Sequence, residues 1–514
     1  MKYFIVQGYW YLEQETGEFQ HRIARPGEMV ARHPEFLVRN VHVYHPLFAQ
    51  LALSADLLIL HLVAEEETAQ IIQRRKKLGK ATLYEIPDNF LKVGDWVPPH
   101  NALRNPMVRQ RILSAARACD SLILSSPALR EVFGAVSDRV QVFENQIDHF
   151  SAPRKKNDFV FGWGGSLGHG HDLAWISPAI ERFCRDFPDA RFAYMGDRGL
   201  FDRLFAYLDN ADYTEPGSLK AYYHFIRKLS VGIAPLIDND FNRCRSDGKF
   251  IEFAAHGVVP LLSDVACYRH HGIDGENALF FSDGESFYQH LKTLYEQPDR
   301  VARLAKQSYD YAKLKRALLN HADKRMAYYR TFLPFEPSLD EIAEIPPCTG
   351  LIAHLHKAHY LADAHEYTEA LEVLDEVLEM HPTYAQAHML RLKTLCNFGY
   401  HREVMEEYHD FACEPVYWDV LYCYLSQSAL ALGDARQSEL VRKIADLGLR
   451  TRCSYKPSLN NERMFRKLLK INPYDYEALI RLSQITAHNP KKVEEASALF
   501  KRAVFMNPEE LGAG

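Results

Sequence analysis

The sequence of 514 residues lacks a long hydrophobic run. Its longest, LLILHLVA at 57–64, is far shorter than the roughly 18 apolar residues of a membrane-spanning helix and is typical of a buried strand. The opening segment MKYFIVQGYW lacks the apolar core of about 7–15 residues found in a secretory signal. We therefore expect a cytoplasmic protein with no integral membrane segment.

Paired cysteines and a basic excess are also missing. The nine cysteines include no C-x-x-C pair, which argues against a disulfide framework or a zinc site. Lys plus Arg number 61 against 67 for Asp plus Glu, so nucleic acid is not an expected partner. With 47% hydrophobic and 25% charged residues, the composition is that of a folded protein, and the length predicts about two to four domains.

Residues 1–150 alternate strand-like and helix-like segments. Two amphipathic stretches, 64–79 and 105–120, lie between apolar runs. Strands that alternate with helices predict a parallel sheet wrapped by helices. The predicted strands are 2–6, 36–44, 56–62, 81–86, 121–125 and 139–145.

Residues 151–333 repeat this alternation. Two consecutive α/β blocks predict two Rossmann-like, doubly wound lobes that face each other across a cleft. A segment with four prolines, 334–350, is interpreted as a linker. The predicted strands of the second lobe are 158–165, 190–196, 229–236, 258–263 and 278–282.

Residues 351–514 show no strand pattern but a repeat of helical segments. Turn positions recur 34 residues apart at His365, Gly399 and Gly433. Prolines recur at similar spacing, Pro382 with Pro415 and Pro473 with Pro508. This pattern resembles the tetratricopeptide repeat (TPR), which implies an all-α solenoid with a groove for protein partners. An unrelated helical bundle is the alternative.

A glycine-rich loop, GWGGSLGHGHDLAWI at 162–176, follows a predicted strand and opens a helix. Glycines let backbone N–H groups approach an anion, and the helix N-terminus adds partial positive charge. The alternative is a tight strand–helix turn without a ligand.

A second motif, FNRCRSDGKFIEFAAHGVVPLLSD at 241–264, runs from a polar loop through a helix into a strand. Lys249 and Glu252 lie at i and i+3 on one helical face, with Arg243 and Arg245 just upstream. Such cations suit phosphates, and a carboxylate can accept two hydrogen bonds from ribose hydroxyls. The alternative is a surface ion pair.

Together the two motifs resemble the C-terminal lobe of GT-B glycosyltransferases, in particular the retaining group 1 enzymes that use nucleotide sugars. The segment ACDSLILSSPALREVFG…RVQVFENQID at 118–148 is similar to the end of the N-terminal lobe in that group. The resemblance covers roughly 80–330 and implies a hexosyltransferase-type reaction. In the family, a UDP-sugar is the favoured donor and no metal is required.

The resemblance also implies roles for individual residues. In the family's pattern a second Glu precedes the ribose Glu by eight positions, and this chain has Cys244 there, which leaves the donor sugar open. The implied donor-binding residues are Gly164, Gly165 and Ser166 at the phosphates, Lys249 with Arg243 or Arg245 at the leaving diphosphate, Glu252 at the ribose, and Tyr213 and Thr214 at the base.

Candidates for contact with the acceptor hydroxyl lie at predicted strand ends in the first lobe. They are Asp88, His61 and a turn at Gln7–Gly8. For Asp88 the alternative is a turn or cap residue after Pro87, and for His61 a core histidine. Together with Lys249, Asp88 and His61 form the predicted catalytic set.

Two further features carry less weight. His169 and His171 have no partner at metal-ligand spacing, so no metal site is expected. The run Arg74–Lys77 is interpreted as a solvated helix face, with peripheral contact to an anionic lipid as the alternative.

The sequence thus predicts a GT-B glycosyltransferase that uses a nucleotide sugar and recruits a protein acceptor through its repeats. In one alternative the acceptor is a polysaccharide or a lipid-linked glycan, and the repeats dock an assembly partner. In another, the chain is a non-catalytic adaptor with a degenerate transferase module, an idea that rests on Cys244.

Overall fold

The structure is a computed structural model. It describes residues 2–10, 16–94, 102–337, 345, 348–382, 384–407, 418–439, 462–471 and 476–506. No helix in this described part of the chain is both long enough and apolar enough to cross a membrane.

The first six strands form one sheet in the order β2-β1-β3-β4-β5-β6. The pairings of β1 with β2 and β3 are parallel, as are those of β5 with β4 and β6. In register, Ile5 of β1 lies opposite Val38 of β2 and Leu57 of β3. The strands predicted in this block are confirmed, with bounds Tyr3–Tyr9 (β1), Phe36–His42 (β2), Leu57–His61 (β3), Ala81–Ile86 (β4), Ser121–Leu124 (β5) and Val140–Val142 (β6).

Short helices connect these strands. Asn105 caps α5 through a hydrogen bond from the Met107 backbone N–H. The helices are α1 (Gly17–Phe19), the π-helix η1 (Gln20–Ala24), α2 (Arg25–Ala31), α3 (Phe48–Ser54), α4 (Glu66–Lys77), α5 (Pro106–Ala118) and α6 (Pro127–Phe133), with 3-10 turns η2 (Phe90–Lys92), η3 (Ala102–Arg104) and η4 (Gly134–Val136).

The basic run at the end of α4 corrects one prediction. Arg74 and Arg75 are buried, so the interpretation of 74–77 as a solvated face is wrong for these two residues. The Arg75 guanidinium donates to the carbonyl oxygens of Ala55 and Ala81, at 2.7 and 2.6 Å, and thereby ties α4 to the chain on either side of it. Lys76 and Lys77 alone of this run are exposed.

The second sheet has the order β12-β11-β10-β7-β8-β9, and its five strand pairings are all parallel. Sequence reasoning missed the edge strand β9 (Ala211–Thr214), whose four half-buried residues lack an apolar run. The others match the predictions and span Val160–Gly164 (β7), Arg191–Met195 (β8), Val231–Ala234 (β10), Val259–Ser263 (β11) and Leu279–Phe281 (β12).

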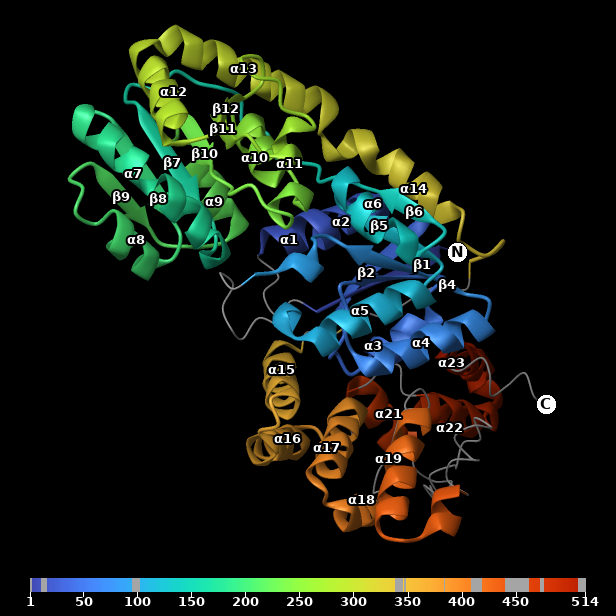
Figure 1. The fold of residues 1–514 in the computed structure, drawn as a ribbon. Helices are drawn as coiled ribbons and strands as arrows, with labels where there is room; N and C mark the ends of the chain where they lie inside the picture. The colour runs from blue at the N-terminus through green and yellow to red at the C-terminus, as the bar shows by residue number, and fades with distance from the viewer. Residues whose placement is uncertain are drawn as a thin grey trace. The chain divides into compact units, whose positions relative to one another are not determined.

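Helices cover both faces of this second sheet (Figure 1). Successive residues of β8 point to opposite faces: Phe192 and Tyr194 join one hydrophobic cluster, and Ala193 and Met195 the other. The first cluster includes side chains of α7 (Gly170–Asp186), α8 (Arg198–Leu204) and α12 (Gly284–Glu296). The second includes those of α9 (Leu219–Ile226), α10 (Gly248–Ala255) and α11 (Ala266–Arg269), an arrangement that fits a doubly wound Rossmann-like lobe.

Longer helices follow the second sheet. Asp283 and Ser286 form a capping box at the start of α12. After α12 come α13 (Pro298–Lys315), the 3-10 turn η7 (Leu318–His321) and α14 (Ala322–Arg330).

The C-terminal part is helical throughout its described residues. Left-handed backbone occurs at His365, Gly399 and Gly433, with φ of 65°, 90° and 86°. These are the three predicted turn positions, and each ends a helix. The TPR assignment itself stays a prediction, and Pro415, Pro473 and Pro508 lie outside the described residues. The helices are α15 (Thr349–Asp363), α16 (Tyr367–Met380), α17 (Ala385–Phe398), α18 (His401–Glu407), α19 (Trp418–Ala431), α21 (Glu462–Ile471), α22 (Tyr476–Ala487) and α23 (Val493–Met506), with the 3-10 turn η10 (Pro490–Lys492).

Contacts group the chain into two compact units. One unit comprises 1–12, 34–82 and 332–514, and the other comprises 13–33 and 83–331. Within the first unit the helical array is joined to the Rossmann-like part, because Gln386 of α17 donates to the Val43 carbonyl at 3.1 Å and Tyr384 donates to the Tyr44 carbonyl. The second unit contains the site described next.

Candidate functional site

A cavity of about 750 Å³, open to solvent, lies within the second unit. Some of its wall residues, among them Pro87, Ser125 and Leu236, lie just beyond the ends of parallel strands. The carboxyl ends of such strands are where α/β folds bind ligands. The wall is formed by Gly17, Glu18, His21, Arg22, Pro87, Asp88, Ser125, Asn145, His169, Leu236, Arg245, Ser246, Gly248, Lys249, Glu252 and Tyr268. We call this cavity the main pocket.

The predicted pair Lys249 and Glu252 lies in the first turns of α10. Lys249 Nζ is 3.6 Å from Glu252 Oε2 and donates to the Tyr222 hydroxyl at 2.5 Å, and this hydroxyl in turn donates to Glu252 Oε2 at 3.1 Å. The Glu252 side chain is 7% exposed and that of Lys249 is 22% exposed. The alternative of a surface ion pair is therefore wrong.

Electrostatics keep Glu252 ionised. Burial by itself raises the pKa of this carboxyl, but Lys249 and the hydrogen bonds from His21 and Tyr222 outweigh burial and lower the pKa to about 2. Burial lowers the pKa of Lys249, and Glu252 opposes that shift. The pocket therefore holds a buried carboxylate next to a cation that is partly open to a ligand.

His21 completes this cluster and was not predicted from the sequence. Its Nε2 lies 3.0 Å from Glu252 Oε1, and its Nδ1 lies 3.3 Å from the Gln146 carbonyl oxygen. Both partners are oxygen atoms that accept hydrogen bonds. His21 lies on the π-helix η1, a rare geometry that is frequent at functional sites. No motif signals this contact, because 231 positions separate His21 from Glu252.

The two arginines upstream of α10 differ in position. Arg245 lines the main pocket and makes no ion pair with any carboxylate of the described residues. Arg243 does not line it; its side chain is 50% exposed and pairs with Asp238 at 2.7 Å and Asp240 at 3.5 Å. Of the two arginines predicted from the sequence, Arg245 is therefore the one brought to the pocket.

The glycine-rich motif reaches the pocket wall through His169 alone. Gly164 ends β7, and a Cβ atom there would lie 2.8 Å from the Tyr222 ring, so the close approach to Tyr222 requires glycine. Gly165 donates from its backbone to the Met195 carbonyl at 3.0 Å, and Ser166 precedes the 3-10 turn η5 (Leu167–His169). His169, which ends this turn, lines the main pocket, whereas Gly164, Gly165 and Ser166 are not among its wall residues.

His169 is held by its own helix. Its Nδ1 lies 3.1 Å from Asp172 Oδ2, and burial and Arg245 lower the pKa of His169 to about 4, although Asp172 opposes the shift. The ring is therefore neutral at pH 7. His171 is exposed, and among the described residues these two histidines belong to no three-ligand cluster.

The residues expected at the base lie away from the main pocket wall. Tyr213 is on the edge strand β9, where its hydroxyl donates to Glu215 at 2.8 Å and the Arg198 guanidinium lies 4.7 Å from its ring centre. Thr214 ends the same strand. Neither residue lines the cavity as the structure has it.

Asp88 lines the main pocket just beyond β4. Desolvation raises the pKa of this half-buried carboxyl, and Arg245 and Arg22 oppose the shift. A carboxylate with a raised pKa is a better proton acceptor than an ordinary one. Asp88 therefore places a carboxyl with a raised pKa in the pocket wall.

Cys244 occupies the position where the family's pattern has a second Glu. It is buried, and its Sγ accepts a hydrogen bond from Asn89 Nδ2 at 3.7 Å. Cys244 is not a wall residue of the main pocket. The thiol thus packs against the chain after β4.

Two candidates from the first lobe belong to the other unit. His61 ends β3 and is buried. Gln7 and Gly8 lie inside β1, so the prediction of a turn there is wrong; Gln7 Nε2 donates to Asn40 Oδ1 across the sheet at 2.7 Å. The apolar run at 2–6 ends before Gln7, so the sequence pattern did not show that β1 continues to Tyr9.

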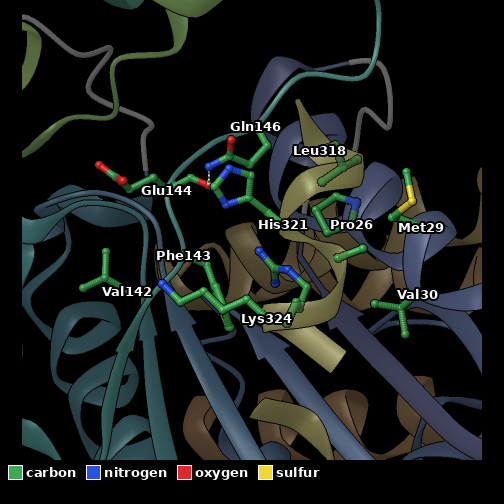
Figure 2. Close-up of a pocket in the computed structure, with 12 residues that line it drawn as sticks. Pro26, Met29, Val30, Val142, Phe143, Glu144, Gln146, Leu318, His321 and Lys324 are labelled. Atoms are coloured by element: carbon green, nitrogen blue, oxygen red, sulfur yellow. Dashed lines mark hydrogen bonds between the residues drawn. The ribbon is translucent and has the colours of Figure 1, made fainter. Parts of the chain in front are cut away.

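A second cavity of about 510 Å³ lies next to the segment 142–146 that follows β6 (Figure 2). Glu144 and Gln146 line this second cavity, whereas Asn145 between them lines the main pocket. Successive side chains of an extended chain point to opposite sides, which explains the alternation. Met29 and Val30 of α2 supply apolar wall, and His321 and Lys324 supply polar groups.

Comparisons with known proteins give structural matches alone. No protein-family model and no curated protein matches the chain. The chain is similar to the crystal structure of Anabaena HepE in complex with UDP-glucose, at 12% identity over 64% of this chain and 100% of that chain, with a TM-score of 0.48. It is similar to sucrose-phosphate synthase from Thermosynechococcus elongatus, at 12% identity over 64% of this chain and 98% of that chain, with a TM-score of 0.49. It is also similar to the pneumococcal O-GlcNAc transferase GtfA in complex with UDP and GlcNAc, at 14% identity over 54% of this chain and 56% of that chain, with a TM-score of 0.42.

Proposed function

We propose that the chain is a glycosyltransferase that moves a sugar from a nucleoside-diphosphate donor to an acceptor hydroxyl. The observation that carries this proposal is the buried Glu252 carboxylate with Lys249 beside it and Arg245 on the same pocket wall. A diphosphate needs cations, and a ribose needs a fixed acceptor of hydrogen bonds. The main pocket offers both.

In this proposal Glu252 holds the ribose. A carboxylate has about four acceptor positions, and in this structure Glu252 receives one hydrogen bond on each oxygen, from His21 and from Tyr222. The remaining positions suit two vicinal hydroxyl groups. His21 and Tyr222 fix the carboxylate in place, so the donor meets a preorganised acceptor.

Lys249 and Arg245 act on the leaving group. Breaking the bond between the sugar and the diphosphate builds negative charge on the phosphate and an oxocarbenium-like centre on the sugar. Cations fixed beforehand near the phosphates stabilise that charge as it develops, so the step needs no metal. The glycine-rich loop from Gly164 to Ser166 would add backbone N–H groups at the start of α7.

Asp88 is the proposed contact for the acceptor hydroxyl. It shares the pocket with Lys249 and Glu252, and its raised pKa favours proton acceptance. The resemblance to group 1 enzymes favours retention of the anomeric configuration. His61 becomes a structural residue in this proposal, because it is buried at the end of β3.

The acceptor is proposed to be a protein recruited by the helical array, which would make the reaction protein O-glycosylation. Support comes from the left-handed turns at His365, Gly399 and Gly433, which give the array a 34-residue repeat of helix pairs. Arrays of this kind build extended surfaces for protein partners. Activity on a polysaccharide or lipid-linked acceptor that persists without residues 351–514 would instead favour docking of an assembly partner.

A donor screen tests the proposal. The full-length protein is incubated with a panel of UDP- and GDP-sugars, and slow release of free sugar is followed by chromatography with detection of the anomer formed. We expect hydrolysis of one donor class, a strong loss of it in Lys249→Ala and Glu252→Ala, and little change in Arg243→Ala. Nucleotide binding without turnover of any donor would favour the adaptor alternative, and unchanged activity in both pocket variants would refute the donor-site assignment.

A further inference from the structure

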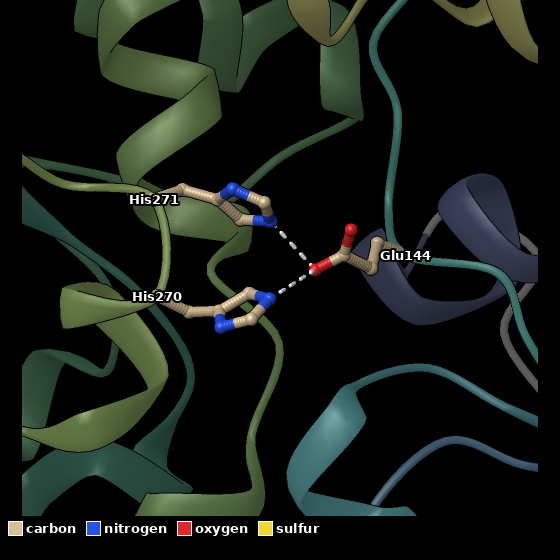
Figure 3. Close-up of side chains that lie close together, drawn as sticks. All are labelled: Glu144, His270 and His271. Atoms are coloured by element: carbon tan, nitrogen blue, oxygen red, sulfur yellow. Dashed lines mark hydrogen bonds and ion pairs between the residues drawn. The ribbon is translucent and has the colours of Figure 1, made fainter.

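Three potential metal ligands gather in the second unit, outside the main pocket wall (Figure 3). Glu144 Oε1 lies 2.7 Å from His271 Nε2 and 3.8 Å from His270 Nε2. One ligand atom from each residue lies within 4.8 Å of the other two. Both imidazoles therefore face one carboxylate oxygen.

Two distant parts of the chain supply these residues. Glu144 lies just beyond β6, in the segment that carries Asn145. His270 is the C-cap of α11, and its backbone N–H donates to Ala266 at 3.2 Å. The carbonyl oxygen of His271 accepts a hydrogen bond from Asn277 Nδ2 at 3.1 Å. The backbone of both histidines is thus fixed before any ligand binds.

We propose that Glu144, His270 and His271 bind a divalent transition-metal ion of the zinc class. Two imidazole nitrogens and one carboxylate oxygen form a known ligand set for Zn²⁺, with a fourth position for water. Ligand atoms at about 2.1 Å from a tetrahedral ion lie about 3.4 Å apart, and the observed separations of 2.7 and 3.8 Å bracket that value. The ligand atoms of the two histidines also lie within 4.8 Å of each other.

The surroundings suit a cation. The nearby Arg316 guanidinium is already committed to Asp247 and to the Asn145 carbonyl. His270 has a half-exposed side chain, which provides the path by which the ion and its water enter.

The bound ion would join two walls of the main pocket. Asn145 follows Glu144 directly, and Tyr268 precedes His270 by two residues; both are wall residues. An ion bound by Glu144 and the two histidines links segments that are 126 and 127 residues apart along the chain. The unfolded chain does not hold these three ligands together, so the ion binds it more weakly than it binds the folded state. The ion would therefore stabilise the second unit and hold the pocket walls at a fixed separation.

Metal titration of the full-length protein tests the site. Zn²⁺ is titrated against a chromophoric chelator, and Co²⁺ is added separately because its visible spectrum reports tetrahedral coordination. We expect the wild type to bind one more tight Zn²⁺ per chain than Glu144→Gln, His270→Ala or His271→Ala, with each affinity at the site weakened more than about 10-fold. His224→Ala, which removes an exposed histidine of α9, serves as the matched control and is expected to bind as the wild type does.

Thermal unfolding gives a second readout. Zn²⁺ should raise the Tm of the wild type and of His224→Ala relative to samples with EDTA, and should leave the Tm of Glu144→Gln unchanged. Equal Zn²⁺ stoichiometry and affinity in the wild type and all three ligand variants would overturn the proposal. Neither readout depends on a nucleotide, so this outcome is independent of the proposed transferase activity.

Discussion

Two buried ion pairs have carboxylates five residues apart in the chain, Asp247 just before α10 and Glu252 within it. The two pairs differ in what surrounds them. Asp247 and Arg316 form a bidentate pair with side chains 5% and 3% exposed, and Arg316 also donates to the Asn145 carbonyl at 2.7 Å. Glu252 and Lys249 are 3.6 Å apart, and the lysine is 22% exposed toward the main pocket.

The difference separates a structural pair from one that can bind a ligand. Both oxygens of the Asp247 carboxylate accept hydrogen bonds from the fork of one guanidinium. Lys249 instead reaches Glu252 mainly through the Tyr222 hydroxyl, which leaves its ammonium group able to turn to a phosphate. Burial of charge alone therefore does not mark a functional site, and we propose that a buried carboxylate with an accessible cation does.

Loss of Arg316 is the largest effect that we expect. Arg316→Met leaves Asp247 buried without its cation and should lower the free energy of unfolding by about 3–5 kcal/mol. Urea denaturation measures this change. Lys249→Met is the matched substitution and should cost clearly less, because His21 and Tyr222 still hold Glu252. Equal losses in the two variants would abolish the distinction between the pairs.

The next largest effect that we expect is on the pH dependence of the free energy of unfolding. The folded pKa of Glu252 is lowered from 4.5 to about 2, so its ionised form stabilises the folded state above pH 4.5, and this contribution is lost as pH falls toward about 2. The shift corresponds to roughly 3 kcal/mol. We expect the difference in unfolding free energy between wild type and Glu252→Gln to be constant from pH 7 to pH 5 and to shrink below pH 4.5. A difference that stays constant down to pH 3 contradicts the assigned network.

Glu252→Gln should weaken nucleotide binding by about 10- to 100-fold. The amide loses an acceptor position and the charge that ribose hydroxyls favour, which corresponds to about 1.5–3 kcal/mol. Isothermal titration calorimetry with UDP and GDP measures the affinity. Glu276→Gln removes an exposed carboxylate outside the pocket wall and is expected to bind as the wild type does.

The smallest effect that we expect is the difference in nucleotide affinity between variants of Arg245 and Arg243. Arg245→Ala removes a pocket cation and should weaken binding of the nucleoside diphosphate by about 10-fold. Arg243→Ala removes a cation that pairs with Asp238 and Asp240, so its affinity should stay within about 2-fold of the wild type. Binding measured at low and moderate salt separates the two variants, and a greater loss in Arg243→Ala would reverse the assignment.

Local sequence patterns predicted the elements that rest on local chemistry. The strand runs are apolar enough to be found, and Lys249 with Glu252 follows from helical spacing alone. Gly399 and Gly433 were found by their 34-residue spacing, and their left-handed backbone favours glycine. The edge strand β9 was missed because half-buried strands carry little apolar signal.

Contacts between distant segments were beyond local patterns. Nothing in the segment around His21 indicates that this ring meets Glu252, and the spacing of Arg243 and Arg245 does not show which one faces the pocket. Arg75 looks like part of a solvated basic run, yet it is buried and donates to main-chain carbonyls. Tertiary packing decides each of these cases.

Calorimetric titration of UDP and GDP into the full-length protein tests the central claim most directly. The wild type is compared with a Lys249→Ala, Glu252→Ala double variant whose folding is verified by circular dichroism. We predict saturable binding at one site per chain in the wild type and no measurable binding in the double variant. Absence of binding in the wild type, or equal affinity in the folded double variant, would contradict the account.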